Sequence, residues 1–312
     1  VLNSILSVAG LILNLVLMYA IRRFSKSHFG TYKYLLTIFT LNDLFLVLLH
    51  VMVHPVVNWS IEKEHSTLWA IVKSFQRVTA LYVGFQSVPF SLLAIHFLYR
   101  YWSVCRPHRI ELFSNKIFVL FLASLIAGGV ISWYFLCLFC SEGHDVTIAK
   151  EILVSEYEIK YEKRVENAWV ILDNWRDGKF DLTLFVVTLL MDAITILSLI
   201  FTFSFAILTF YHIAKSDKMS IQATALQQKL LIALCAQASV PFVFVYAPFL
   251  VCINLPFLGI PGNTFYPDLV APIFTCFPVW DGFIIIVLIQ DYRKGLLGMI
   301  RKPPPVAPST ML

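Results

Sequence analysis

The chain has 312 residues, of which 59% are hydrophobic and only 14% are charged. Soluble domains carry about 25% charged residues, so this composition excludes a soluble globular protein. Aromatic residues make up 15% of the chain, and such side chains are well accommodated in lipid and at its interfaces. The sequence therefore predicts an integral membrane protein.

Seven apolar segments are each long enough to cross a bilayer core of about 30 Å as a helix. They cover residues 2–21, 34–54, 68–99, 117–139, 182–211, 226–253 and 268–289. No segment shows the strict alternation of apolar and polar residues that is typical of a transmembrane β-strand. We therefore expect one all-α domain over residues 1–312, a seven-transmembrane helix bundle. Val1 already lies at the edge of the first span, so we expect an initiator methionine and a short segment before it.

Basic residues gather in alternate connections between these spans. They are Arg22, Arg23, Lys26 and Lys33 after the first span, Arg100, Arg106, Arg109 and Lys116 around the end of the third, Lys215, Lys218 and Lys229 after the fifth, and Arg293, Lys294, Arg301 and Lys302 in the tail. Because basic loops stay on the cytoplasmic side, the N-terminus should lie outside and the tail 290–312 in the cytosol. The net charge of +5 then describes the inner face and does not indicate nucleic-acid binding.

The long connection 140–181 falls on the extracellular side in this topology. It is rich in acidic residues but also contains Ile, Val, Tyr and Trp, so it is either a solvated loop or a lid that gates a ligand. The cysteine positions allow a disulfide between Cys140 and Cys252 without establishing one. Asn58-Trp59-Ser60 matches a glycosylation acceptor on the same side.

Several polar residues fall inside the predicted spans, where an ionised side chain is unfavourable. Asn14, Asp43 and Asp281 lie at similar depths on three spans, which predicts one intramembrane polar cluster. This cluster is either a conformational switch or a static network that joins helices. Asp192 on the fifth span either pairs with Arg77 or anchors a ligand.

The sequence gives little support for an enzyme or a metal site. His50 and His54 are four residues apart and could ligate zinc only with further ligands, for which His65 is the remaining candidate. We therefore expect these histidines to pack at a helix interface, and we expect no metal, no cofactor and no enzymatic activity. No phosphate-binding loop or nucleophile elbow occurs in the sequence.

A ligand pocket is predicted in the outer half of the bundle. On the third span, Tyr82, Gln86 and Pro89 fall on nearly one helix face. A few polar groups in an apolar cavity are typical of small-molecule sites. Residues on later spans that reach a comparable depth are Asp192, Tyr246, Phe249 and Phe274. Prolines inside the spans (Pro89, Pro241, Pro248, Pro272 and Pro278) predict kinks.

Three motifs resemble those of the Str group of nematode seven-transmembrane chemoreceptors. They are AIHFLYRYWSVCRP at 94–107, QQKLL with VPFVFVYAP at 227–231 and 240–248, and PVWDGF with QDYRK at 278–283 and 290–294. The likeness covers nearly the whole chain. Members of the group often have a second proline after the aspartate, where this chain has Gly282.

The resemblance implies a G-protein-coupled receptor of chemosensory neurons that detects small odorants or soluble chemicals. It implies a plasma-membrane location, in sensory cilia, with a heterotrimeric G protein and membrane lipid as partners. Arg100 would control coupling, together with His96, Tyr99, Tyr101, Arg106 and Arg109. No acid precedes Arg100, so we expect a tyrosine or His96 to hold it at rest. A peptide receptor and an odorant-gated channel or transporter are the alternatives.

Overall fold

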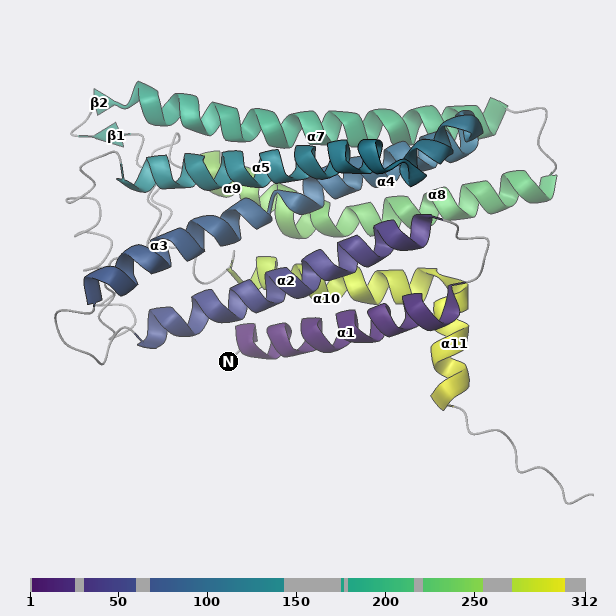
Figure 1. Ribbon diagram of the computed structural model, residues 1–312, viewed down its shortest axis with the longest axis horizontal. Helices are drawn as coiled ribbons and strands as arrows, with labels where there is room; N and C mark the ends of the chain where they lie inside the picture. The colour runs from purple at the N-terminus through teal and green to yellow at the C-terminus, as the bar shows by residue number, and fades with distance from the viewer. Residues whose placement is uncertain are drawn as a thin grey trace, which may run out of the picture.

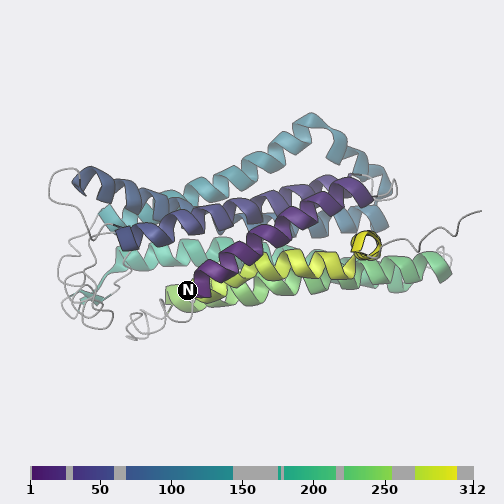
Figure 2. The ribbon, with the colours of Figure 1, turned by 90° about the horizontal axis from the view of Figure 1, so that it is seen from below.

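The computed structural model describes residues 2–25, 31–59, 68–142, 175–176, 179–215, 221–254 and 271–300. Side chains are described for most of these residues, with 52–59, 68–76 and 221–226 among the exceptions. The chain folds into long, roughly parallel helices (Figures 1 and 2).

The first two spans are single helices, α1 (Leu2–Phe24) and α2 (Tyr32–Trp59). Leucine, isoleucine and valine occur around the whole circumference of each, as expected for a helix in lipid. α1 lies against both α2 and α10 (Ala271–Leu288), so the two ends of the chain meet in the bundle. α1 ends after Arg22 and Arg23, two exposed cations at its C-terminal turn.

The third span is broken into α3 (Leu68–Phe85) and α4 (Val88–Cys105). Pro89 stands in the first turn of α4 and has no N–H to donate to the carbonyl of Phe85. At the break, Ser87 donates from both its backbone N–H and its hydroxyl to the carbonyl of Gly84. The kink predicted from Pro89 is therefore a short interruption, and the span continues to Cys105 instead of ending at residue 99.

Two further spans follow a 3₁₀ segment, η2 (Pro107–Ser114). α5 (Lys116–Glu142) and α7 (Leu182–Lys215) cross the bundle, and α7 packs against α4. Between them, β1 (Trp175–Arg176) pairs antiparallel with β2 (Lys179–Phe180). The rest of the predicted extracellular connection lies outside the described residues, as do the side chains of Cys140, Cys252 and Asn58.

The sixth span contains α8 (Ile221–Pro241), a π-helical turn η3 (Phe242–Tyr246) and α9 (Ala247–Asn254). Pro241 ends the regular α-helical hydrogen bonding, as its missing N–H requires. After α10, the chain turns by 90° into α11 (Gln290–Ile300), which the sequence analysis treated as tail. Figure 2 shows α11 end-on beneath the bundle.

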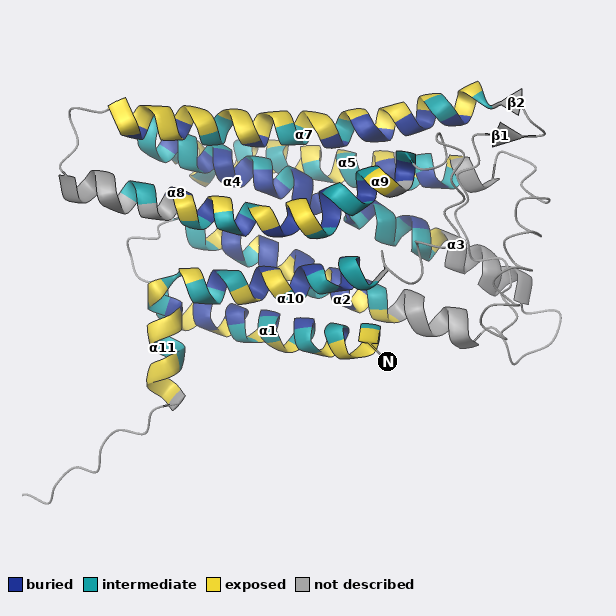
Figure 3. Ribbon diagram, turned by 180° about the vertical axis from the view of Figure 1, so that it is seen from behind, coloured by how far each residue is buried: buried dark blue, intermediate teal, exposed yellow. Residues whose placement is uncertain are grey.

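Exposed residues run along the outward faces of the helices (Figure 3), and many of them are large and apolar. Ile5, Ile117 and Leu182 are each at least 60% exposed, which suits lipid contact. Six described helices are long and apolar enough to span a membrane, and α10 with α11 adds a seventh as a bent pair. The predicted all-α transmembrane bundle is confirmed.

Candidate functional site

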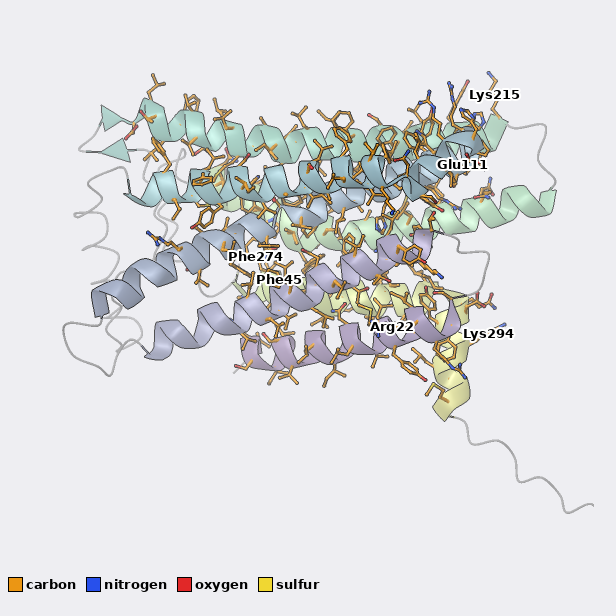
Figure 4. All side chains as sticks on the ribbon, viewed as in Figure 1. Arg22, Phe45, Glu111, Lys215, Phe274 and Lys294 are labelled. Atoms are coloured by element: carbon orange, nitrogen blue, oxygen red, sulfur yellow. The ribbon has the colours of Figure 1, made fainter. Side chains whose placement is uncertain are left out.

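A pocket opens between α1, α2, α3 and α10, and we call it the four-helix pocket. It is lined by Ser7, Leu46, Val47, His50, Tyr82, Gln86, Phe274, Thr275, Phe277 and Pro278. Its atom-free space is about 240 Å³ when the open side is included. Figure 4 marks Phe274, which lies in the half of the bundle away from α11.

His50 connects three of the helices around this pocket. Its Nδ1 lies 3.3 Å from the hydroxyl of Tyr82 on α3, and its Nε2 lies 3.0 Å from the hydroxyl of Thr275 on α10. Either hydroxyl can donate or accept, so the ring is held in one orientation whichever nitrogen carries the proton. The sequence analysis treated His50 as interface packing, and the structure adds that it lines a pocket.

Only part of the predicted ligand site surrounds this pocket. Tyr82, Gln86 and Phe274 line it, whereas the described lining does not include Pro89, Tyr246, Phe249 or Asp192. The break at residues 86–87 explains why Pro89 does not line the pocket, because α4 does not continue the helical register of α3.

Tyr246 and Phe249 belong instead to an aromatic cluster with Phe90 and Trp133. The ring of Phe90 lies 3.9 Å from that of Tyr246, and Trp133 lies 4.5 Å from Phe249, centroid to centroid. The Tyr246 hydroxyl is 2.6 Å from that of Ser198 on α7. These rings fill the space that the sequence analysis assigned to a ligand.

Of the two alternatives given for Asp192, the pair with Arg77 does not occur among the described contacts. Oδ1 of Asp192 accepts a hydrogen bond from the side-chain amide of Asn254 at 3.2 Å, and Arg77 is exposed. A neutral donor therefore takes the place of the expected cation. The side chain of His54, which the sequence analysis considered together with His50, lies outside the described part of the structure.

The structure brings together the three residues of the predicted intramembrane polar cluster. Asp43 and Asp281 are both fully buried and close enough to interact electrostatically, and none of their carboxyl oxygens has a hydrogen-bond partner among the described residues. We call them the carboxyl pair. Gln237 of α8 approaches Asp281 and was missed in the sequence analysis. Two ionised carboxylates repel each other strongly when they are buried away from water. The separation of α2 and α10 at this point therefore depends on the charge of the two carboxyl groups.

Asn14 joins α1 to the same cluster. Its Nδ2 donates to the carbonyl of Gly10 at 2.9 Å and to that of Pro278 at 2.8 Å. A Cβ added to Gly282 would lie 3.2 Å from the Asn14 side-chain oxygen. Glycine therefore allows a close approach of α1 at this position, and α10 continues through it without a break.

Arg100 lies at the other end of the bundle and contacts α8. Its Nη2 donates to Oε1 of Gln227 at 2.6 Å, and we call this the Arg100–Gln227 contact. The sequence analysis expected a tyrosine or His96 as the partner. An uncharged amide takes that place, so α4 and α8 are held together by a charge-assisted hydrogen bond and not by an ion pair.

The other residues predicted to act in coupling surround Arg100 in different ways. His96 is fully buried and packs edge-on to Tyr32 and Phe39, with ring centroids 5.6 and 5.5 Å away. Tyr99 stacks on Tyr32 and accepts a hydrogen bond from Thr31.

Tyr101 stacks on Phe205 of α7, and Arg109 lies over the ring of Trp102 at 5.9 Å. Arg106 is exposed at the C-cap of α4. Four of the predicted residues, His96, Tyr99, Tyr101 and Arg109, therefore make aromatic contacts.

The end of the bundle that carries Arg100 is also rich in basic side chains. Arg22, Lys215 and Lys294 lie there, with Glu111 among them (Figure 4). α11 is fixed to this end by the Tyr292 hydroxyl, 2.8 Å from that of Ser25, and by Gly295, where a Cβ would clash with Phe24. No group of three or more His, Cys, Asp or Glu side chains that could hold a metal occurs in the described part of the chain.

The comparisons with known proteins agree with this architecture. The sequence profile described as "Serpentine type 7TM GPCR chemoreceptor Str" matches residues 1–297. The chain is 24% identical over 299 residues to serpentine receptor class r-10 of Caenorhabditis elegans, covering 92% of this chain and 86% of that protein. It is 26% identical over 298 residues to the Caenorhabditis briggsae protein of the same name, covering 90% and 84%.

A third relative is the G-protein coupled receptor str-33 of Caenorhabditis elegans, 23% identical over 305 residues, with 92% of this chain and 86% of that protein covered. The resemblance inferred from the three motifs is thereby confirmed. The chain belongs to the serpentine Str family of seven-transmembrane G-protein-coupled chemoreceptors.

Proposed function

We propose that this receptor detects small molecules outside the cell and signals to a heterotrimeric G protein inside. The observation that carries the proposal is the Arg100–Gln227 contact, which joins α4 to α8 at the basic end of the bundle. A contact of this kind holds the two helices together at rest. Its opening would free the guanidinium of Arg100 for the G protein.

The basic end is the cytosolic end in this proposal. Exposed cations at the end of α1, in η2 and at the start of α11 support it, because cytoplasmic segments retain Lys and Arg. The four-helix pocket then lies in the outer half of the membrane, where an external ligand arrives. We place the receptor in the plasma membrane of sensory cilia, with lipid around its apolar surface and no enzymatic activity.

The pocket and the Arg100–Gln227 contact are linked through the carboxyl pair. Val47 and Pro278 line the pocket, and each is three or four residues, about one helical turn, from Asp43 or Asp281. A ligand that shifts α2 against α10 changes the separation of the two carboxyl groups. Gln237 approaches Asp281 and lies on α8 about 15 Å from Gln227 by helical rise, so α8 transmits the shift.

The coupling role is tested with Gln227→Ala and Arg100→Ala in the full-length receptor. Gln227→Ala should raise nucleotide exchange without ligand, because the resting contact is lost. Arg100→Ala should abolish exchange at matched expression, and Arg100→Lys should restore only part of it, because lysine lacks the planar donor fork. Arg22→Ala is the matched control, at an exposed arginine at the same end of the bundle that is not among the residues predicted to act in coupling. Unchanged exchange in Arg100→Ala would refute the role.

Topology separates the receptor from the channel and transporter alternatives. An epitope inserted near Lys163 should be labelled on intact cells, and one appended after Leu312 should be labelled only after permeabilisation. Labelling of the tail on intact cells would favour a channel of opposite orientation. A response confined to peptides in a mixed ligand panel would favour the peptide receptor.

A further inference from the structure

Among the residues that the structure describes, the lining of the four-helix pocket contains no Asp, Glu, Lys or Arg. A charged ligand would therefore be transferred from water to this site without a counter-charge, which is strongly unfavourable. The lining combines the apolar side chains of Leu46, Val47, Phe274, Phe277 and Pro278 with hydroxyl, imidazole and amide groups. Such a site selects an uncharged molecule with one polar group.

Gln86 supplies the polar group that specifies this molecule. The residue is only 4% exposed, and its Oε1 is buried without a hydrogen-bond partner among the described residues. Its backbone N–H donates to the carbonyls of Tyr82 and Val83 at the end of α3. These two hydrogen bonds fix the residue at the helix break. A buried acceptor without a donor is unfavourable by itself and favours a ligand that donates to it.

We propose that the ligand is a small uncharged molecule that carries an O–H or N–H donor and binds with this group on Oε1 of Gln86. Its apolar part contacts Phe274 and Phe277. The enclosed part of the pocket is about the size of a water molecule, so it takes the donor group of the ligand, and the few other heavy atoms extend into the open side of the space of about 240 Å³. This inference rests on the proposed function, because it names the chemistry that the same pocket recognises.

The experiment measures the stabilisation of the purified full-length receptor against heat by four probes of similar size. The probes are 2-butanol, 2-butanone, butanoate and butylammonium. The alcohol should stabilise the receptor at a concentration about tenfold lower than the ketone, which lacks a donor, and lower still than either ion. Gln86→Leu should remove the preference of alcohol over ketone, and Gln290→Leu, the same change at an exposed position of α11, should retain it.

Equal stabilisation by alcohol and ketone, or a preference that survives in Gln86→Leu, would overturn the inference. Stabilisation by none of the four probes would overturn it as well. Nucleotide exchange, measured in parallel, separates this result from the proposed function. If 2-butanol binds with the expected preference but leaves exchange unchanged, the ligand chemistry stands and the signalling proposal fails. If the ketone binds and activates as well as the alcohol, the signalling proposal stands and the donor requirement fails.

Discussion

The four-helix pocket and the aromatic cluster differ in how completely side chains fill them. The pocket is bounded by polar side chains at the junction of α1, α2, α3 and α10. In the cluster, the rings of Phe90, Trp133, Tyr246 and Phe249 pack directly on one another between α4, α5 and the sixth span. The contrast teaches that polar groups around a space indicate recognition, whereas closely packed rings indicate stability.

The largest effect is expected in the aromatic cluster. Trp133 is fully buried, so Trp133→Ala should lower the free energy of unfolding by about 3–5 kcal/mol, through lost contacts and the cavity that remains. Trp280→Ala is the matched control, because Trp280 is 44% exposed, stacks on Phe244 and lies edge-on to Phe283. Thermal unfolding in detergent measures both variants. Equal losses would show that the cluster is no more important to stability than the lipid-facing surface.

An intermediate effect is expected at the pocket. His50→Phe keeps a ring but removes the two nitrogens that contact Tyr82 and Thr275. Ligand potency should fall about tenfold, because the two hydroxyls lose the group that orients them. Concentration–response curves for nucleotide exchange measure this change. A variant with the potency of the wild type would show that the orientation of His50 is irrelevant to recognition.

A smaller effect is expected from Tyr246→Phe, which keeps the ring against Phe90 and removes the hydrogen bond to Ser198. The free energy of unfolding should fall by about 1 kcal/mol, with no change in the rank order of ligands. Ser198→Ala should have a similar effect, and the double variant should add little to either. A changed rank order would place Tyr246 in the ligand site after all.

The smallest effect is expected from Asp192→Asn. The substituted amide can still accept from Asn254, and Asp192 does not line the pocket. Ligand potency should therefore change less than about twofold, because the hydrogen bond from Asn254 is kept and only the charge is removed. A large loss of potency, with normal surface expression, would restore Asp192 as a ligand anchor.

The helices and the polar cluster could be predicted from the sequence, because apolar length and depth along a regular helix are set by rise per residue. Asn14, Asp43 and Asp281 were placed together in this way. Gln227 and Gln237 were missed because an uncharged amide inside a span gives no signal comparable to that of a carboxylate.

The lining of the pocket could be predicted only in part, because helix faces change at irregular turns. Tyr82 and Gln86 precede the break in the third span, and Pro89 follows it. In the sixth span, the π-helical turn Phe242–Tyr246 places an extra residue in the turn. Phe249 was proposed from its depth alone, and depth does not say which way a residue faces after such a turn.

The most direct test compares Gln86→Leu in the pocket with Phe249→Leu in the aromatic cluster, at matched surface expression. The measurement is the rank order of potencies over one panel of small alcohols, ketones, acids and amines. The account predicts that Gln86→Leu changes the rank order and that Phe249→Leu lowers thermal stability while the rank order stays the same. An unchanged rank order in Gln86→Leu, or a changed one in Phe249→Leu, would contradict it.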